Sequence, residues 1–126
     1  MAESRFNDGD LEKQVAELSD HIATLGDFYS SGTLANSSGT WTNTGISKSQ
    51  SDNYRWVSIC LVISSQNRIM SIATIPIKYM YSNAATKLEA SFDTDGNFTA
   101  AVQYDATNQK WIYAAKGWDA VVILTK

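Results

Sequence analysis

The sequence predicts a mainly β protein, in which a short N-terminal coiled-coil helix precedes an antiparallel β-sandwich or jelly-roll-like head. Two observations support this fold class. Apolar residues recur at heptad spacing between Leu11 and Leu25, and from Phe28 onward apolar and polar residues alternate between turn sequences. The chain has 126 residues, 44% of them hydrophobic, which suffices for one core but not for two. We therefore expect a stem at residues 1–27 and one head domain at residues 28–126.

The stem is predicted from five apolar residues spaced alternately four and three positions apart, as at the a and d positions of a coiled coil. These seam residues are Leu11, Val15, Leu18, Ile22 and Leu25. Asn7 or Asp8 can cap the start of the helix, and Gly26 can end it because glycine adopts the left-handed conformation at little cost. The seam predicts a homo-oligomer. The alternative is an amphipathic helix that packs on its own domain, although such helices usually have a broader apolar stripe.

The number of chains in the oligomer stays open. The β-branched residues Val15 and Ile22 at a positions, with leucines at d positions, favour two strands, whereas many stems that carry bulky heads are trimers. Two heptads are too short to associate stably alone. Either the head shares the interface or the natural stem continues upstream.

The head is predicted as a series of strands and turns. Residues 30–53 are rich in Ser, Thr, Asn and Gly, which favours exposed loops and short edge strands over the alternative of a disordered linker. A strand at residues 54–64 has apolar side chains on both faces, as in a sandwiched or intersubunit strand, and Trp56 is expected in the core. A second long strand is predicted at residues 68–81, where Pro76 indicates an edge or a bulge. Further strands are expected at residues 87–93, 97–104, 110–115 and 119–126.

Charge and hydropathy argue against two classes of partner. The net charge is −3 and the chain lacks the clustered Lys/Arg surface that phosphate binding needs, so we predict no nucleic-acid partner. No apolar run approaches the roughly 20 residues of a membrane helix. We therefore predict no membrane insertion.

The sequence offers no recognisable catalytic centre. One histidine on the stem, His21, and one cysteine in an apolar strand, Cys60, supply neither a nucleophile–base pair nor a zinc site. Cys60 is expected to be a buried, reduced thiol. Asp93 and Asp95 lie at a predicted turn, where Asp is favoured for backbone reasons, so this run is interpreted as a hairpin turn rather than as half of a calcium loop or a glycosidase acid. We predict a protein that is not an enzyme and has no metal or other cofactor.

Aromatic residues near turns are the candidate ligand-binding residues. Trp111 and Trp118 are expected to be exposed because they lie near turns, and Asp105 and Asn108 supply polar groups. Tyr104 completes the set. A flat aromatic face beside polar acceptors can hold a sugar ring, so we predict a glycan site at the end of the head away from the stem. The alternative is that core packing accounts for the same aromatics.

The heptad seam that ends at Gly26, the Ser/Thr/Asn/Gly-rich passage around residues 37–42 and the Pro- and Cys-poor β head together resemble the C-terminal tip of bacteriophage tail-fibre or receptor-binding proteins. The resemblance implies a homotrimer at a tail-fibre or baseplate tip of the virion, which acts outside the host cell. It also implies a bacterial surface glycan as partner. The competing class is a structural virion spike, decoration or trimerisation module that binds only protein.

Overall fold

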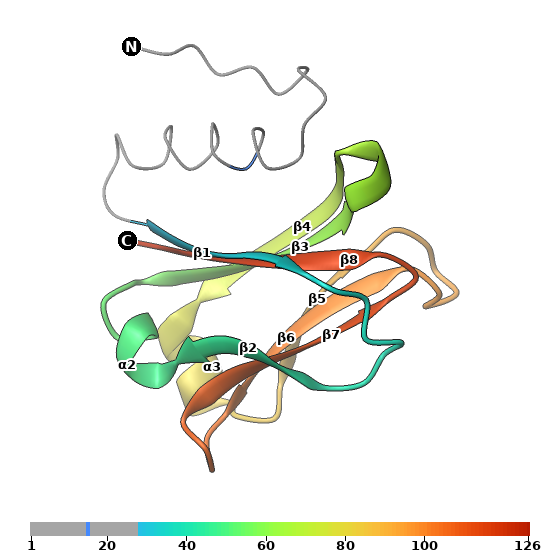
Figure 1. Ribbon diagram of the computed structural model, residues 1–126. Helices are drawn as coiled ribbons and strands as arrows, with labels where there is room; N and C mark the ends of the chain where they lie inside the picture. Colours follow the sequence, from blue (N-terminus) through green and yellow to red (C-terminus); the bar gives the residue numbers. More distant parts are fainter. Residues whose placement is uncertain (1–14, 16–27) are drawn as a thin grey trace, which may run out of the picture.

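The computed structural model describes residue 15 and residues 28–126, and residues 28–126 fold into two antiparallel sheets of four strands that pack face to face (Figure 1). The strands are β1 (Phe28–Leu34), β2 (Thr42–Ser47), β3 (Trp56–Ile63), β4 (Arg68–Pro76), β5 (Lys87–Ser91), β6 (Thr99–Asp105), β7 (Lys110–Lys116) and β8 (Asp119–Thr125). The short helices are α2 (Lys48–Ser51), η1 (Ser64–Gln66) and α3 (Ile77–Ser82). The mainly β class predicted for the head is confirmed.

The two sheets interleave along the sequence. Sheet A has the order β1-β8-β3-β4 and sheet B has the order β2-β7-β6-β5. The first strand, β1, therefore pairs with the last strand, β8, and β2 pairs with β7. Both of the first two strands are thus paired with strands from the end of the sequence. The predicted strands at residues 87–93, 97–104, 110–115 and 119–126 correspond to β5, β6, β7 and β8 within two residues at each boundary.

The main hydrophobic core lies between the sheets. Each strand of the interior contributes alternate side chains to it, as the two-residue period of a strand requires. The largest fully buried side chain is Trp111 of β7, and Ile59 and Leu61 of β3 and Leu124 of β8 also pack there.

The strand β3 is buried on both faces, as its sequence predicts. Val57, Ile59 and Leu61 belong to the core between the sheets, whereas Cys60 and Val62 belong to a second cluster on the opposite face of sheet A. Cys60 is a buried free thiol. Burial raises its pKa from the ordinary value of 9.0 to about 12, because the thiolate would lose its hydration. The expectation that Cys60 is buried is confirmed.

The predicted strand at residues 68–81 is wrong in its second half. β4 ends at Pro76, and residues 77–82 form α3. Pro76 has a φ of −61° and no N–H to donate to a ladder, so it ends the strand and precedes the helix. The edge position that Pro76 indicated is confirmed, because β4 is the last strand of sheet A.

Trp56 is not a core residue, contrary to expectation. It is the first residue of β3, it pairs with Pro76 at the end of the sheet, and its side chain is 38% exposed. Alternation along β3 places Trp56 on the same face as Cys60, away from sheet B.

Of the five seam residues, the structure describes only Val15, which has a helical backbone and is half-buried. Leu11, Leu18, Ile22 and Leu25 lie outside the described residues. The coiled-coil stem therefore stays a prediction.

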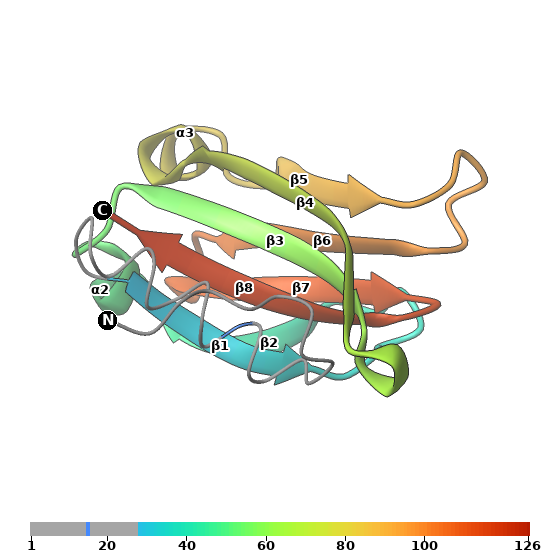
Figure 2. The same cartoon turned by 90° about the horizontal axis from the view of Figure 1, so that it is seen from above.

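The sandwich has two distinct ends (Figure 2). The near end is the one at which the chain enters the head at Phe28, and the far end is the opposite one. At the near end, Phe28 of β1 pairs with Thr125 of β8, and the turn between β6 and β7 follows the pair Asp105–Lys110. At the far end lie the loop between β5 and β6 and the turn between β7 and β8. The chain thus enters and leaves the head at the near end.

Candidate binding surface

The structure does not bring the five predicted binding residues together. Asp105 and Asn108 lie in the near-end turn, whereas Trp118 lies in the far-end turn that follows β7. The seven residues of β7 separate the two turns, a distance of about 20 Å at 3.3 Å per residue. Only Trp118 occupies the end away from the chain entry, where the whole set was expected.

Trp111 and Tyr104 lie in the core, so the expectation that Trp111 is exposed is wrong. Trp111 is 0% exposed, and it shares the inner face of β7 with Tyr113 and Ala115, which also belong to the core between the sheets. The Tyr104 ring lies beside it in a tilted arrangement, with ring centroids 5.3 Å apart. Closeness to a turn did not decide exposure, because the strand's alternation fixes the face on which each side chain lies.

Asp105 and Asn108 are engaged within their own turn. Asp105 accepts hydrogen bonds from the backbone N–H groups of Thr107 and Asn108, and its second oxygen accepts from the Asn108 side-chain amide at 2.8 Å. The Asn108 side chain, followed by its backbone N–H, holds the pKa of the Asp105 carboxyl below its usual value. Both residues have a structural role here as turn formers.

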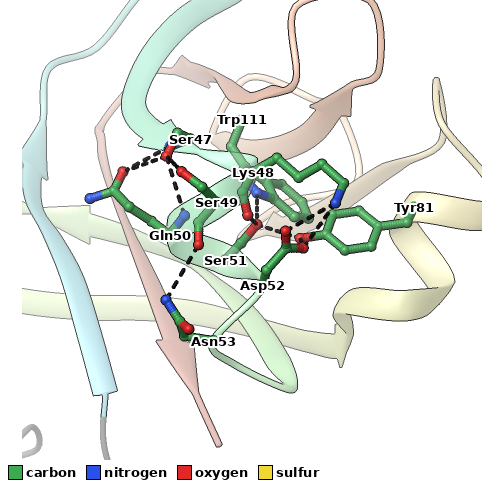
Figure 3. A network of polar contacts seen from close by, with 9 residues as sticks. All are labelled: Ser47, Lys48, Ser49, Gln50, Ser51, Asp52, Asn53, Tyr81 and Trp111. Atoms are coloured by element: carbon green, nitrogen blue, oxygen red, sulfur yellow. Dashed lines mark hydrogen bonds and ion pairs between the residues drawn. The ribbon is translucent and has the colours of Figure 1, made fainter.

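A polar network at the near end joins α2 to α3 and β7 (Figure 3). The hydroxyl of Ser51 accepts a hydrogen bond from the Trp111 indole N–H at 2.8 Å and donates to the Lys48 carbonyl at 2.9 Å. The Tyr81 hydroxyl lies 2.5 Å from the Ser51 oxygen and donates to Asp52 at 2.9 Å. Asp52 also pairs with the Lys48 ammonium at 3.0 Å.

This network is built to hold α2 in place rather than to react. Ser51 is fully buried, so a substrate has no access to its hydroxyl. Its hydrogen-bond partners are the Trp111 indole, the Tyr81 phenol and the Lys48 carbonyl, and none of them is a general base at neutral pH. Burial, the largest influence, raises the pKa of Tyr81 and keeps its phenol protonated. The network therefore acts as a polar clamp.

The far end carries a cluster of three aromatic rings that the sequence analysis did not identify. Phe92 and Phe98 come from the loop between β5 and β6, and Trp118 comes from the turn between β7 and β8. The ring centroid of Trp118 lies 4.2 Å from that of Phe98 and 5.2 Å from that of Phe92. Phe92 is 55% exposed, so this far-end aromatic cluster presents ring surface to solvent.

The backbone fixes this cluster at two points. Gly117 precedes Trp118 with a φ of +83°, and a Cβ at this position would overlap the Phe98 ring and the Asn97 carbonyl. The Phe92 N–H donates to the Phe98 carbonyl at 3.1 Å and closes the loop between β5 and β6. These two contacts hold the loop between β5 and β6 against the turn that carries Trp118.

Two carboxylates flank the far-end aromatic cluster. Asp119, next to Trp118, accepts hydrogen bonds from the Asn36 N–H at 2.8 Å and from the Ser64 hydroxyl at 2.5 Å, which ties the loop between β1 and β2 and the helix η1 to this end. Asp93, next to Phe92, differs. Among the described residues, its Oδ1 is the buried side-chain oxygen that has no hydrogen-bond partner.

Comparisons with known proteins give no match: no protein-family model matches the chain, no curated protein matches it and no solved structure matches it. Within residues 28–126 and Val15, no group of three or more His, Cys, Asp or Glu side chains could hold a metal ion. In the same part of the chain, no helix has the length and apolar character needed to cross a membrane.

Proposed function

We propose that this protein is a non-catalytic binding head that recognises a bacterial surface glycan through the far-end aromatic cluster. The observation that carries the proposal is the position of Phe92, Phe98 and Trp118. They form a fixed, partly exposed aromatic surface at the end opposite to the entry and exit of the chain. A support attached through the chain's entry would leave this end free to meet a receptor.

The chemistry of the cluster suits a sugar. The C–H face of a pyranose packs against an aromatic ring, and its hydroxyls need hydrogen-bond acceptors close by. Asp93 follows Phe92 in the chain, and its buried Oδ1 has no hydrogen-bond partner, so a rotation of this carboxylate toward the rings would offer a sugar hydroxyl an acceptor. Rigid rings also lose little side-chain entropy on binding, which favours a ligand with few contacts.

The resemblance of the sequence to tail-fibre and receptor-binding tips supports a position on a virion, outside the host cell. Single sugar sites are weak, and a millimolar Kd corresponds to about −4 kcal/mol. Several linked heads raise avidity by roughly 10² to 10⁴, because each later contact is intramolecular. A virion that displays several copies would supply this gain.

The test compares two exposed aromatic side chains at opposite ends. Phe92→Ala removes a ring from the far-end cluster, and Tyr79→Ala removes a ring that is 47% exposed on α3 at the near end. We expect the parent and Tyr79→Ala to adsorb saturably to bacterial envelopes or to spots of a glycan array. We expect Phe92→Ala to bind at least tenfold more weakly with an unchanged Tm.

Equal adsorption by Phe92→Ala and the parent would overturn this site assignment. Absence of saturable binding by the parent to every envelope and glycan preparation would overturn glycan recognition. It would favour the structural virion module that binds only protein.

A further inference from the structure

The outer face of sheet A, which points away from sheet B, carries a buried apolar cluster. Cys60 and Val62 of β3 and Val121 and Ile123 of β8 form it, and each is at most 3% exposed. Cys60 lies directly opposite Val121 in the register of the two strands, which places their side chains on one face. Sheet B covers the other face of sheet A, so it cannot account for this burial.

Val15 is the described residue outside the sandwich that packs against this outer-face cluster. Its backbone is helical and its side chain is half-buried. In the sequence Val15 is the second of the five seam residues, whose spacing places one apolar stripe along one side of a helix. A residue that was expected to contact other copies of the chain thus contacts its own head.

The geometry points to a docking surface that works within one chain: the outer face of sheet A binds the apolar seam around Val15, residues 11–25, as its cover. The connection is short, because only twelve residues separate Val15 from Phe28. Phe28 begins β1, which pairs with β8, the strand that carries Val121 and Ile123. The chain therefore enters sheet A beside the surface that the seam covers.

The width of the buried region fits a single helix. A helix is about 10 Å wide and neighbouring strands lie about 4.8 Å apart, so one helix covers about two strands. Burial is complete on β8 and β3 and only partial on the edge strand β4. Ile69 of β4 packs against the cluster, whereas Ile72, which lies opposite Cys60 on the same face, is 54% exposed. The narrow heptad stripe, which favoured a coiled coil, matches a two-strand surface equally well.

Cys60 makes this docking measurable, because it is the only cysteine of the chain and lies beneath the cover. The experiment measures the rate at which a water-soluble aromatic disulfide modifies the Cys60 thiol in the full chain, together with the mass in solution by light scattering. Leu18→Asp puts a charge on the seam. Ser19→Asp puts the same charge one residue away, off the seam, and is the matched control.

We expect the parent and Ser19→Asp to be monomers of about 13.9 kDa with a nearly unreactive thiol. We expect Leu18→Asp to remain a folded monomer whose thiol reacts at least tenfold faster, because burying an unpaired charge opposes docking. Near-ultraviolet circular dichroism checks that the head stays folded. Val15→Ala serves where Leu18→Asp unfolds the head, and its thiol should react several-fold faster than that of the parent.

Two results would overturn the proposal. A parent mass of two or three chains at micromolar concentration would assign the seam to a coiled coil between copies. A Cys60 thiol that stays as slow as in the parent, in folded Leu18→Asp or in Val15→Ala, would show that something other than the seam covers it. Neither result bears on glycan recognition at the far end.

Discussion

The two ends of the sandwich carry similar aromatic residues in different environments. At the near end, Trp111 and Tyr81 are packed against the core and their polar atoms are hydrogen-bonded through Ser51 and Asp52. At the far end, Phe92 is 55% exposed, and Trp118 is half-buried beside it. The near-end tryptophan is therefore part of the core, whereas the far-end tryptophan packs on the edge of the core beside an exposed ring.

The two ends also differ in whether their buried polar atoms have hydrogen-bond partners. Each near-end side chain of Figure 3 has a partner within hydrogen-bond distance. At the far end the Asp93 oxygen has none, although it is shielded from water. A buried unpaired acceptor costs free energy, which the fully paired near-end network avoids. The comparison therefore predicts that near-end variants change stability and far-end variants change binding.

The largest expected effect comes from removing the same side chain at each end. Trp111→Ala deletes a fully buried indole and should lower the free energy of unfolding by about 3–5 kcal/mol, because the cavity cannot refill. Trp118→Ala deletes a partly exposed indole and should cost clearly less, while glycan binding falls. Urea denaturation measures the first effect and envelope adsorption the second. An equal loss of stability in both variants would break the comparison, since Trp118 would then be a core residue.

A smaller effect is expected from the hydroxyl at the centre of the clamp. Ser51→Ala leaves the Trp111 indole N–H without its acceptor in a buried position, which should cost about 1–3 kcal/mol. Ser49→Ala, on the exposed side of the same helix, is the matched control and should change stability by less than about 0.5 kcal/mol. Equal urea-denaturation midpoints for Ser51→Ala and Ser49→Ala would mean that a water molecule replaces the lost acceptor of the Trp111 indole.

Much of the sandwich was predictable because its strands have a strong two-residue period and end at turn residues. The strand β7 is an example: Trp111, Tyr113 and Ala115 are buried in the core and alternate with less buried residues, and the strand ends before the turn at Gly117. The helix α3 was not predictable in this way. Ile77, Tyr79 and Tyr81 continue the alternation of β4, and only the position of Pro76 marks where the backbone changes.

The candidate site was less predictable than the fold, for a topological reason. Turn residues can be recognised from sequence, but the end of the sandwich on which a turn lies depends on strand order. Asp105 and Trp118 thus belong to opposite ends. Phe92 and Phe98 were placed inside predicted strands, although both lie in the loop between β5 and β6. One local signal was present and missed: Ser47 and Gln50 form a capping box that starts α2, a pattern readable from their spacing alone.

The smallest expected effect concerns the exposed ion pair of the clamp. Hydrogen bonds from the Lys48 ammonium, and next from the Tyr81 hydroxyl, hold the pKa of Asp52 below its ordinary value of 3.8. A carboxyl with a lowered pKa in the folded state stabilises the fold at pH values above 3.8, and this contribution is lost as the pH falls through the folded pKa. Asp52→Asn should therefore lower the urea midpoint slightly at pH 7, and the gap from the parent should close as the pH falls below 3.8 and through the lowered pKa of Asp52. Salt at 1 M should narrow the same gap at pH 7, since the pair is open to solvent.

Lys48→Met should reproduce both the pH dependence and the salt dependence, because it removes the other partner of the ion pair. A gap between parent and Asp52→Asn that stays constant down to pH 2 would show that Asp52 contributes through the shape of α2 and not through its charge.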